Sequence, residues 1–230
     1  MNMPESPNTG EDSRVFEIKD CALIAIATGS RAVNLKELRD ILSTISLDSV
    51  YYHFWGGLLQ PRFEVREYNN DFAAWAWHGL HDGALAERLA VVDPTEFKDL
   101  EDLRQELLEI IEERLDEQIY HSLLYASSSF EFIRSQIVVF DTQKRMKTPE
   151  ELAELLPTLS TGSIFYHFID ARRRLEHHGD DLSFWLSGCE PRYHVLCSKL
   201  AGIDPYFGNL IQLKQQLTKI FQDFFVKEGI

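Results

Sequence analysis

Hydrophobic and polar positions form a pattern that occurs twice along this chain. Each copy opens with an apolar stretch, 18–28 or 132–142, which is rich in β-branched and aromatic residues. This stretch ends in a polar triplet, at 29–31 or at 143–145. Strand-forming residues that lead into a polar turn predict a short β-hairpin at the start of each copy. The alanines of 21–27 are also compatible with the start of a helix, so this first element has two interpretations.

An amphipathic helix is predicted next in both copies. Asn34 with Glu37, and Thr148 with Glu151, have the spacing of a capping box. In that motif the cap side chain accepts from a free backbone N–H and the glutamate reaches back to another. Leucines then recur at helical spacing, at positions 35, 38 and 42 in the first copy and at 152, 155 and 156 in the second.

Shorter apolar patterns predict the remaining helices. A short aromatic helix, 49–55 or 163–169, begins with a serine that can cap it. The next helix begins at Asp71 or Asp181, where a carboxylate can accept from backbone N–H groups and face the positive end of the helix dipole. The last two helices of each copy are expected at 85–92 and 100–119, and at 195–203 and 210–226.

The distances between these landmarks are nearly constant in the two copies. The cap precedes a histidine by 19 residues in both, from Asn34 to His53 and from Thr148 to His167. The segment from the aspartate to an Asp-Pro stop spans 22 residues in one copy and 23 in the other. The loop between histidine and aspartate differs more, 18 residues against 14. Length changes confined to one loop are typical of homologous units, because surface connections tolerate insertions.

The repetition predicts an α+β, predominantly helical fold of two tandem homologous units. We expect each unit to open with its β-hairpin and the two to pack with pseudo-twofold symmetry, as an isologous dimer would. The expected order is a disordered tail, a first unit, a linker and a second unit, at 1–13, 14–119, 120–129 and 130–230. The linker is not rich in glycine or proline, so we expect it to pack or to continue a helix.

Nine residues of the first copy resemble a phrase of the type H-x-F, N-D-F-x-x-W and L-A-x-x-L, with Phe54 directly after His53. They are His53, Phe54, Asn70, Asp71, Phe72, Trp75, Leu85, Ala86 and Leu89. With this phrase the chain resembles an uncharacterised bacterial and archaeal domain family of unknown function. The second copy matches at His167, Phe168, Asp181 and Trp185, and departs at Asp180, Leu182 and Cys197. The resemblance covers most of the chain and implies a fold, but it implies no activity.

Charge is distributed unevenly along the chain. The net charge is -14; residues 1–120 hold 24 acids and 11 bases, whereas residues 121–230 hold 13 acids and 12 bases. A strongly acidic half argues against a nucleic-acid backbone or an anionic membrane as partner. Much of the excess lies in 96–117, which is either a solvated helix face or a docking surface for something basic.

Other features of the sequence place the chain in the cytoplasm. No apolar run approaches the roughly 20 residues that span a bilayer, and the N-terminus lacks the pattern of a secretion signal. Cys21, Cys189 and Cys197 have neither disulfide nor metal-ligand spacing, which favours reduced thiols. The sequence has no P-loop, no dinucleotide-binding turn, no Gly-x-Ser-x-Gly and no His-Glu-x-x-His, so no cofactor is expected.

Two histidine–aspartate pairs, His53 with Asp71 and His167 with Asp181, are the first candidate sites. Such a pair can serve as a general base, bind a phosphate or a sugar, or form half of a metal site. The ordinary alternative is a semi-buried histidine hydrogen-bonded to a helix-capping aspartate. Its presence in both copies favours that structural role, because catalysis seldom needs two identical copies.

Three further groups are candidates with equally simple alternatives. Adjacent His177 and His178 are the most metal-like string, although a solvated polar loop is the simpler interpretation. Arg172, Arg173 and Arg174 can hold a small anionic ligand or pair with nearby acids, which are Glu176, Asp180 and Asp181. The tryptophans could form a sugar-stacking platform, but aromatics at helical spacing are more often core residues.

The sequence leads to two hypotheses about function. The first is a non-enzymatic cytosolic interaction or regulatory module, whose acidic first half docks a basic partner or a second copy of itself. The alternative is a metal- or sugar-phosphate-binding protein, possibly an enzyme, that uses the His/Asp pairs at the interface between the repeats. Neither a nucleic acid nor a membrane is an expected partner.

Overall fold

The computed structural model describes residues 15–59, 67–117, 124–175, 178–206 and 208–228. The predicted disordered tail and the first four residues of the predicted linker lie outside these ranges. Within them the chain is α+β and mostly helical, as predicted, with one two-stranded antiparallel sheet. No helix of the described ranges is both long enough and apolar enough to cross a membrane.

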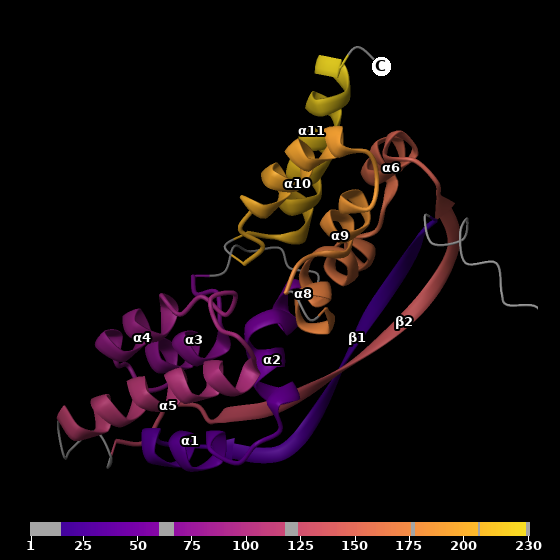
Figure 1. Ribbon diagram of the computed structural model, residues 1–230. Helices are drawn as coiled ribbons and strands as arrows, with labels where there is room; N and C mark the ends of the chain where they lie inside the picture. The colour runs from indigo at the N-terminus through magenta and orange to yellow at the C-terminus, as the bar shows by residue number, and fades with distance from the viewer. Residues whose placement is uncertain (1–14, 60–66, 118–123, 176–177, 207, 229–230) are drawn as a thin grey trace, which may run out of the picture. The chain divides into compact units, whose positions relative to one another are not determined.

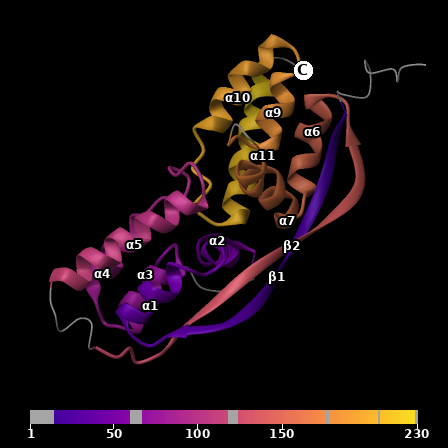
Figure 2. The same ribbon diagram turned by 60° about the horizontal axis from the view of Figure 1, so that its bottom comes forward.

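The two strands run side by side in both views of the ribbon (Figure 1, Figure 2). They are β1 (Phe16–Ala32) and β2 (Phe130–Met146), of 17 residues each. The hydroxyl of Thr28 donates to the carbonyl of Phe132 at 2.7 Å, and that of Thr142 donates to the carbonyl of Ile18 at 2.5 Å. Since Thr28 and Phe132 are near the end and the start of their strands, the strands run antiparallel.

The chain divides into two compact units, and each unit contains a part of both strands. Residues 22–138 form one unit, which we call the central unit. Residues 1–21 and 139–230 form the other, which we call the terminal unit. The predicted boundaries would assign each strand whole to one repeat, whereas both strands pass from one compact unit into the other.

The predicted β-hairpins are wrong, because each apolar opening stretch belongs to one uninterrupted strand. The polar triplets 29–31 and 143–145 were expected to reverse the chain, but they lie inside β1 and β2. Gly29 and Gln143 have positive φ angles of 81° and 61° at matching places. One left-handed residue within a strand is typical of a β-bulge. A two-residue hairpin loop would instead form a type I′ or II′ turn.

The central unit contains five α-helices within its described residues. Its helix α1 and its helix α2 pack against α5, and α3 packs against α4. The core includes Phe130 of β2, which stacks on Phe72 of α3 with ring centroids 5.1 Å apart. The elements are α1 (Leu35–Leu42), α2 (Leu47–Trp55), the 3-10 helix η2 (Gly56–Leu58), α3 (Asp71–His78), α4 (Gly83–Ala90) and α5 (Leu100–Glu117).

The terminal unit contains a larger number of short helical segments, followed by one long helix. Helix α9 packs against α10, and α11 contacts α6, α7 and α10. Phe16 of β1 lies in its core, with its ring centroid 5.2 Å from that of Trp185. The elements are α6 (Pro149–Leu155), η4 (Leu156–Thr158), α7 (Thr161–Ile164), the π-helix η5 (Phe165–Asp170), α8 (Ala171–Arg174), α9 (Asp181–Ser187), η6 (Pro191–Tyr193), α10 (His194–Ala201) and α11 (Leu210–Glu228).

Both predicted capping boxes are present. The Asn34 side chain accepts from the N–H of Glu37 at 2.8 Å, and the Glu37 carboxylate accepts from the N–H of Val33 at 3.0 Å. Thr148 and Glu151 make the corresponding pair of bonds in the terminal unit. Each box satisfies two backbone donors, one in the first turn of the helix and one on the residue before the cap.

Two other sets of predicted caps were misplaced. The aromatic helices begin one turn earlier than expected, with Ser46 and Ser160 as caps, so Ser49 and Ser163 are buried inside the helical segments. Helices α3 and α9 are capped by Asn70 and Asp180. Asp71 and Asp181 are therefore the first helical residues, and their carboxylates reach His53 and His167.

The described part of the predicted linker, 124–129, packs on the central unit. The N–H of Ala126 donates to the carbonyl of Val33 at 2.7 Å, and the N–H of Ser127 donates to that of Gly79 at 2.8 Å. The indole of Trp75 donates to the carbonyl of Ser128 at 2.7 Å. This segment delivers the chain to the start of β2.

Candidate functional site

His53 is buried in the central unit with both ring nitrogens engaged. Its Nδ1 lies 3.0 Å from Oδ2 of Asp71, the first residue of α3. Its Nε2 accepts the backbone N–H of Ile133 in β2 at 3.2 Å. A nitrogen that accepts cannot carry a proton, so the ring is the neutral tautomer whose Nδ1–H donates to the carboxylate.

His167 has the same arrangement in the terminal unit. Its Nδ1 lies 2.7 Å from Oδ2 of Asp181, and its Nε2 accepts the backbone N–H of Lys19 in β1 at 2.9 Å. The side chain is buried like that of His53. In each unit an aspartate therefore orients a histidine, and the histidine holds one backbone N–H of a strand. We call each such set a strand latch.

The histidines of the two strand latches are as far apart in sequence as the two strand residues that they hold. His167 follows His53 by 114 residues (167 − 53), and Ile133 follows Lys19 by 114 residues (133 − 19). Thr148 also follows Asn34 by 114 residues, although the latch aspartates are only 110 apart because the loop before Asp181 is shorter. The repeated hydrogen bonds thus occur at the spacing of the repeated sequence.

The surroundings of both rings are aromatic. The ring of His53 has its centroid 4.6 Å from that of Phe130 and 5.3 Å from that of Phe72. The ring of His167 lies 5.0 Å from that of Phe16. With one nitrogen on a carboxylate, the other on a backbone N–H and aromatic rings around, neither imidazole has a nitrogen left for a metal ion or for proton transfer.

The residue before each latch aspartate differs between the units. Asn70 accepts from the N–H of Ala73 and donates its amide to the carbonyl of Leu89 at 2.9 Å. Asp180 is equally buried but accepts two hydrogen bonds, both from Ser183, at 2.7 and 2.8 Å. Burial raises the pKa of the Asp180 carboxyl, and the Ser183 hydrogen bonds and the charge of Arg172 oppose this effect.

The three consecutive arginines at 172–174 are engaged within the terminal unit. Arg173 and Arg174 both pair with Asp170, a carboxylate that is only 1% exposed, at 3.0 Å. Arg174 also pairs with Asp181 at 3.0 Å, and its guanidinium lies 4.0 Å from the ring centroid of Tyr166. Arg174 therefore joins the strand latch of His167 to a buried carboxylate.

Asp170 was missed as a site residue, although its position contained the signal. It precedes Arg173 and Arg174 by three and four residues, the separation at which side chains of a helix meet. The predicted partners of the arginines were Glu176, which lies outside the described residues, Asp180 and Asp181. The ion pairs with Asp170 and Asp181 leave less of the guanidinium surface for an anionic ligand.

The remaining metal and anion candidates do not converge. Arg172 donates through Nε to the carbonyl of Phe168 at 3.3 Å, and its guanidinium lies 5.2 Å from the centroid of that ring. His177 lies outside the described residues; Nδ1 of His178 lies 3.3 Å from the carbonyl of Arg172. Among the residues that the structure describes, no group of three or more His, Cys, Asp or Glu side chains could hold a metal ion.

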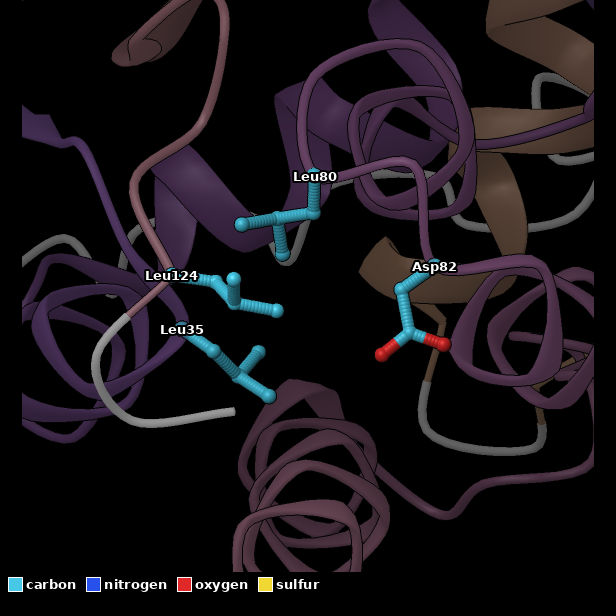
Figure 3. A pocket seen from close by; sticks show the side chains of 4 residues that line it. All are labelled: Leu35, Leu80, Asp82 and Leu124. Atoms are coloured by element: carbon cyan, nitrogen blue, oxygen red, sulfur yellow. The ribbon is translucent and has the colours of Figure 1, made fainter. Parts of the chain in front are cut away.

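A small, partly open hollow in the central unit was not foreseen from the sequence. Figure 3 shows three leucines and one carboxylate around it. The carboxylate of Asp82 is engaged, because it accepts two hydrogen bonds from Arg114, at 2.9 and 3.0 Å, and one from the N–H of Leu85. The lining residues are Leu35, Leu80, Asp82 and Leu124.

The fold and the site define an α+β protein whose paired histidines hold its strands in place. The chain belongs to a family of unknown function, DUF5752, whose model matches residues 13–222. It is also similar to a solved structure, OrfY from Thermoproteus tenax, at 26% sequence identity and a TM-score of 0.78. That likeness covers 91% of this chain and 94% of the other. The comparison with curated proteins gave no match.

Proposed function

We propose that this chain is a non-enzymatic interaction or regulatory module built from two pseudo-symmetric helical repeats. Its acidic first half docks a basic partner protein, or a basic surface of a second copy. The strand latches support the non-enzymatic part of this proposal, since their four ring nitrogens already have hydrogen-bond partners. The equal spacing of the latch histidines and of the strand residues that they hold supports the repeat.

The observation that carries the docking proposal is a stripe of carboxylates on α5. Successive members are separated by four or three residues, which places them on one face of the helix. Among the described residues, none of the five carboxylates has an ion pair or a hydrogen-bond donor. We call this set the acidic stripe; it consists of Asp102, Glu106, Glu109, Glu113 and Asp116.

The fold does not require these charges. Leu103 of α5 matches Leu213 of α11 in the repeat, and this match aligns the acidic stripe with a set that contains one acid and one base. Like charges three or four residues apart destabilise a helix by about 0.2–0.5 kcal/mol per pair. Charges that lower stability and have no partner within the fold are expected where a surface binds another molecule. The matching residues of α11 are Gln212, Gln216, Lys219, Asp223 and Val226.

The test is binding of an arginine-rich peptide at low and at high salt, together with light scattering of the protein alone. The variant E106Q/E109Q/E113Q removes three charges from the acidic stripe; E131Q/E154Q/E190Q removes three from elsewhere and serves as control. We expect salt-sensitive association that the stripe variant loses and the control keeps. A monomer that binds no basic partner at low salt, or a control that loses as much, would overturn the proposal.

The alternative function, binding of a metal or a sugar phosphate at the His/Asp pairs, has a direct test. A ligand would have to displace the N–H of Lys19 or of Ile133 from a ring nitrogen. Elemental analysis of protein purified without a His-tag, and melting with zinc or manganese, measure this. A ligand at about 100 times its dissociation constant stabilises a protein by about 2.7 kcal/mol. A stabilisation of that size that disappears in His167→Ala would favour the alternative.

A further inference from the structure

Trp77 stands apart from the other described tryptophans. Trp55 and Trp75 are buried, whereas 41% of Trp77 is exposed at the end of α3. Its ring centroid lies 6.2 Å from that of Tyr68, at an interplanar angle of 47°. The two rings thus form an aromatic pair at the surface of the central unit.

The helix pair α3–α4 does not need this aromatic pair for its packing. Asp71 matches Asp181 in the repeat, so Trp77 matches Ser187 and Tyr68 matches His178. Helix α9 packs against α10 with a serine where α3 has the tryptophan. The packing of two such helices therefore does not require a tryptophan at this position. An exposed tryptophan of this kind is a candidate for binding, since tryptophan and tyrosine are enriched among the residues that dominate interfaces.

Two carboxylates lie beside the aromatic pair. Glu67 is next to Tyr68, and its carboxylate lies 3.3 Å from Nε2 of His78. A Cβ atom on Gly83 of α4 would lie 3.0 Å from the Trp77 ring, and Glu87 follows Gly83 by one helical turn on the same face. Burial, and then the negative charges of Glu87 and Glu67, raise the pKa of the Tyr68 hydroxyl. Within the described ranges, no lysine or arginine pairs with either glutamate.

Aromatic faces next to carboxylates that have no lysine or arginine partner among the described residues suit an organic cation. The face of an indole attracts a guanidinium or an ammonium group through its quadrupole, and the carboxylates add charge attraction. A neutral sugar would use the aromatic faces but would gain little from two negative charges. The acidic composition of the first 120 residues favours a cation for the same reason.

We propose that Trp77 and Tyr68, with Glu67 and Glu87, form an anchor site for an arginine or lysine side chain of a basic partner. This inference rests on the proposed docking function and adds one defined site to it. The anchor site and the acidic stripe use different residues on different helices, so each can be removed without the other.

The test uses the full chain and two synthetic peptides, one rich in arginine and the other with citrulline, its neutral isostere, in place of each arginine. The indole N–H signals of nitrogen-15-labelled protein report on the four tryptophans, and each is assigned with a tryptophan-to-phenylalanine variant. We expect the arginine peptide to shift the Trp77 signal and the citrulline peptide to leave it unchanged. Trp77→Ser, which introduces the residue of the matching position, should weaken binding about two- to fivefold.

The outcomes separate the anchor site from the docking function. If the arginine peptide binds in a salt-sensitive manner without moving the Trp77 signal, and Trp77→Ser binds as tightly, the anchor site is overturned and the docking function stands. If the citrulline peptide or a neutral oligosaccharide shifts Trp77 as strongly, the assignment to a cation is overturned. If the arginine peptide does not bind the unmodified protein at low salt, both proposals are overturned.

Discussion

The strand latches of the two units are alike, but their surroundings are not. In both units a buried histidine accepts a hydrogen bond from a strand N–H through Nε2. Its Nδ1 is hydrogen-bonded to an aspartate at the start of a helix. Within the described residues, the terminal unit extends this set through Arg174 to the buried Asp170. At the place of Asp170, 114 residues earlier, the central unit has Gly56. The shared part satisfies a strand N–H, whereas the added part joins charged side chains and satisfies the carbonyl of Tyr166 through Arg174.

The hydrogen bond to the strand N–H is a need of the fold in both units, whereas the carboxylate of Asp170 is an addition in the terminal unit. A strand N–H in an apolar core must find an acceptor, and an unpaired one costs about 1–3 kcal/mol. Both units meet that need with the same residue pair, which explains why the repeated phrase contains a histidine and an aspartate. The charge network needs a separate explanation, because the central unit has no carboxylate at the position of Asp170.

The largest expected effect comes from removing a latch. His53→Ala or His167→Ala leaves a cavity among aromatic rings and an unpaired strand N–H, and we expect each to lower the free energy of unfolding by about 3–5 kcal/mol. Denaturant unfolding of the full chain measures it. His194→Ala, at an exposed histidine, is the control, with an expected change below about 0.5 kcal/mol. Similar losses for both latches support a shared structural role; a loss below 1 kcal/mol contradicts it.

The second prediction concerns Asp170, a carboxylate that the central unit lacks at the matching position. Asp170→Asn keeps the shape of the side chain but removes the carboxylate that Arg173 and Arg174 share, whereas Arg174 keeps its ion pair with Asp181. Since Asp170 is buried and both arginines are partly exposed, we expect a loss of about 1–3 kcal/mol. Chemical denaturation at low and high salt measures it. No change in stability would show that the network is not a stabilising addition.

The third prediction exchanges the residues that differ at the helix caps. Asp180→Asn should stabilise the protein by about 1 kcal/mol at neutral pH, because it removes a buried charge and keeps an oxygen that can accept from the N–H of Ser183. Asn70→Asp is the reciprocal variant and should destabilise, since it buries a charge and loses a hydrogen bond. Thermal unfolding of both variants at neutral pH measures the pair; equal signs would contradict the interpretation.

The same exchange predicts a dependence on pH. Burial raises the pKa of Asp180 above its ordinary value of 3.8, so the folded protein holds that proton more tightly than the unfolded chain. The contribution of Asp180 to stability is therefore greatest below 3.8 and falls as the pH rises through the raised pKa. We expect the advantage of Asp180→Asn to grow across this window. Unfolding curves from pH 3 upward measure it, and a constant difference would contradict the raised pKa.

The sequence predicted local features well and long-range ones poorly. The capping boxes at Asn34 and Thr148 depend only on residues within one turn, so their spacing was sufficient. The hairpins failed because Gly29 and Gln143 carry the same signal whether a chain reverses or forms a bulge. Only the pairing partner decides, and β1 pairs with residues more than 100 positions away. Spacing likewise suggested the His/Asp pairs, but not that each ring holds a strand N–H, since Lys19 and Ile133 are distant in sequence.

The smallest expected effect on stability comes from the acidic stripe. Glu109→Gln with Glu113→Gln removes like-charge repulsion along α5, so we expect the free energy of unfolding to rise by no more than about 0.5 kcal/mol at low salt. The gain should disappear at high salt, because exposed charges are screened. The matched control, Gln216→Glu with Lys219→Glu on α11, places like charges three and four residues apart beside Asp223 and should lower stability by a similar amount. If instead the stripe variant is less stable, its carboxylates have partners within the fold, and an internal role would replace docking as the reason for their presence.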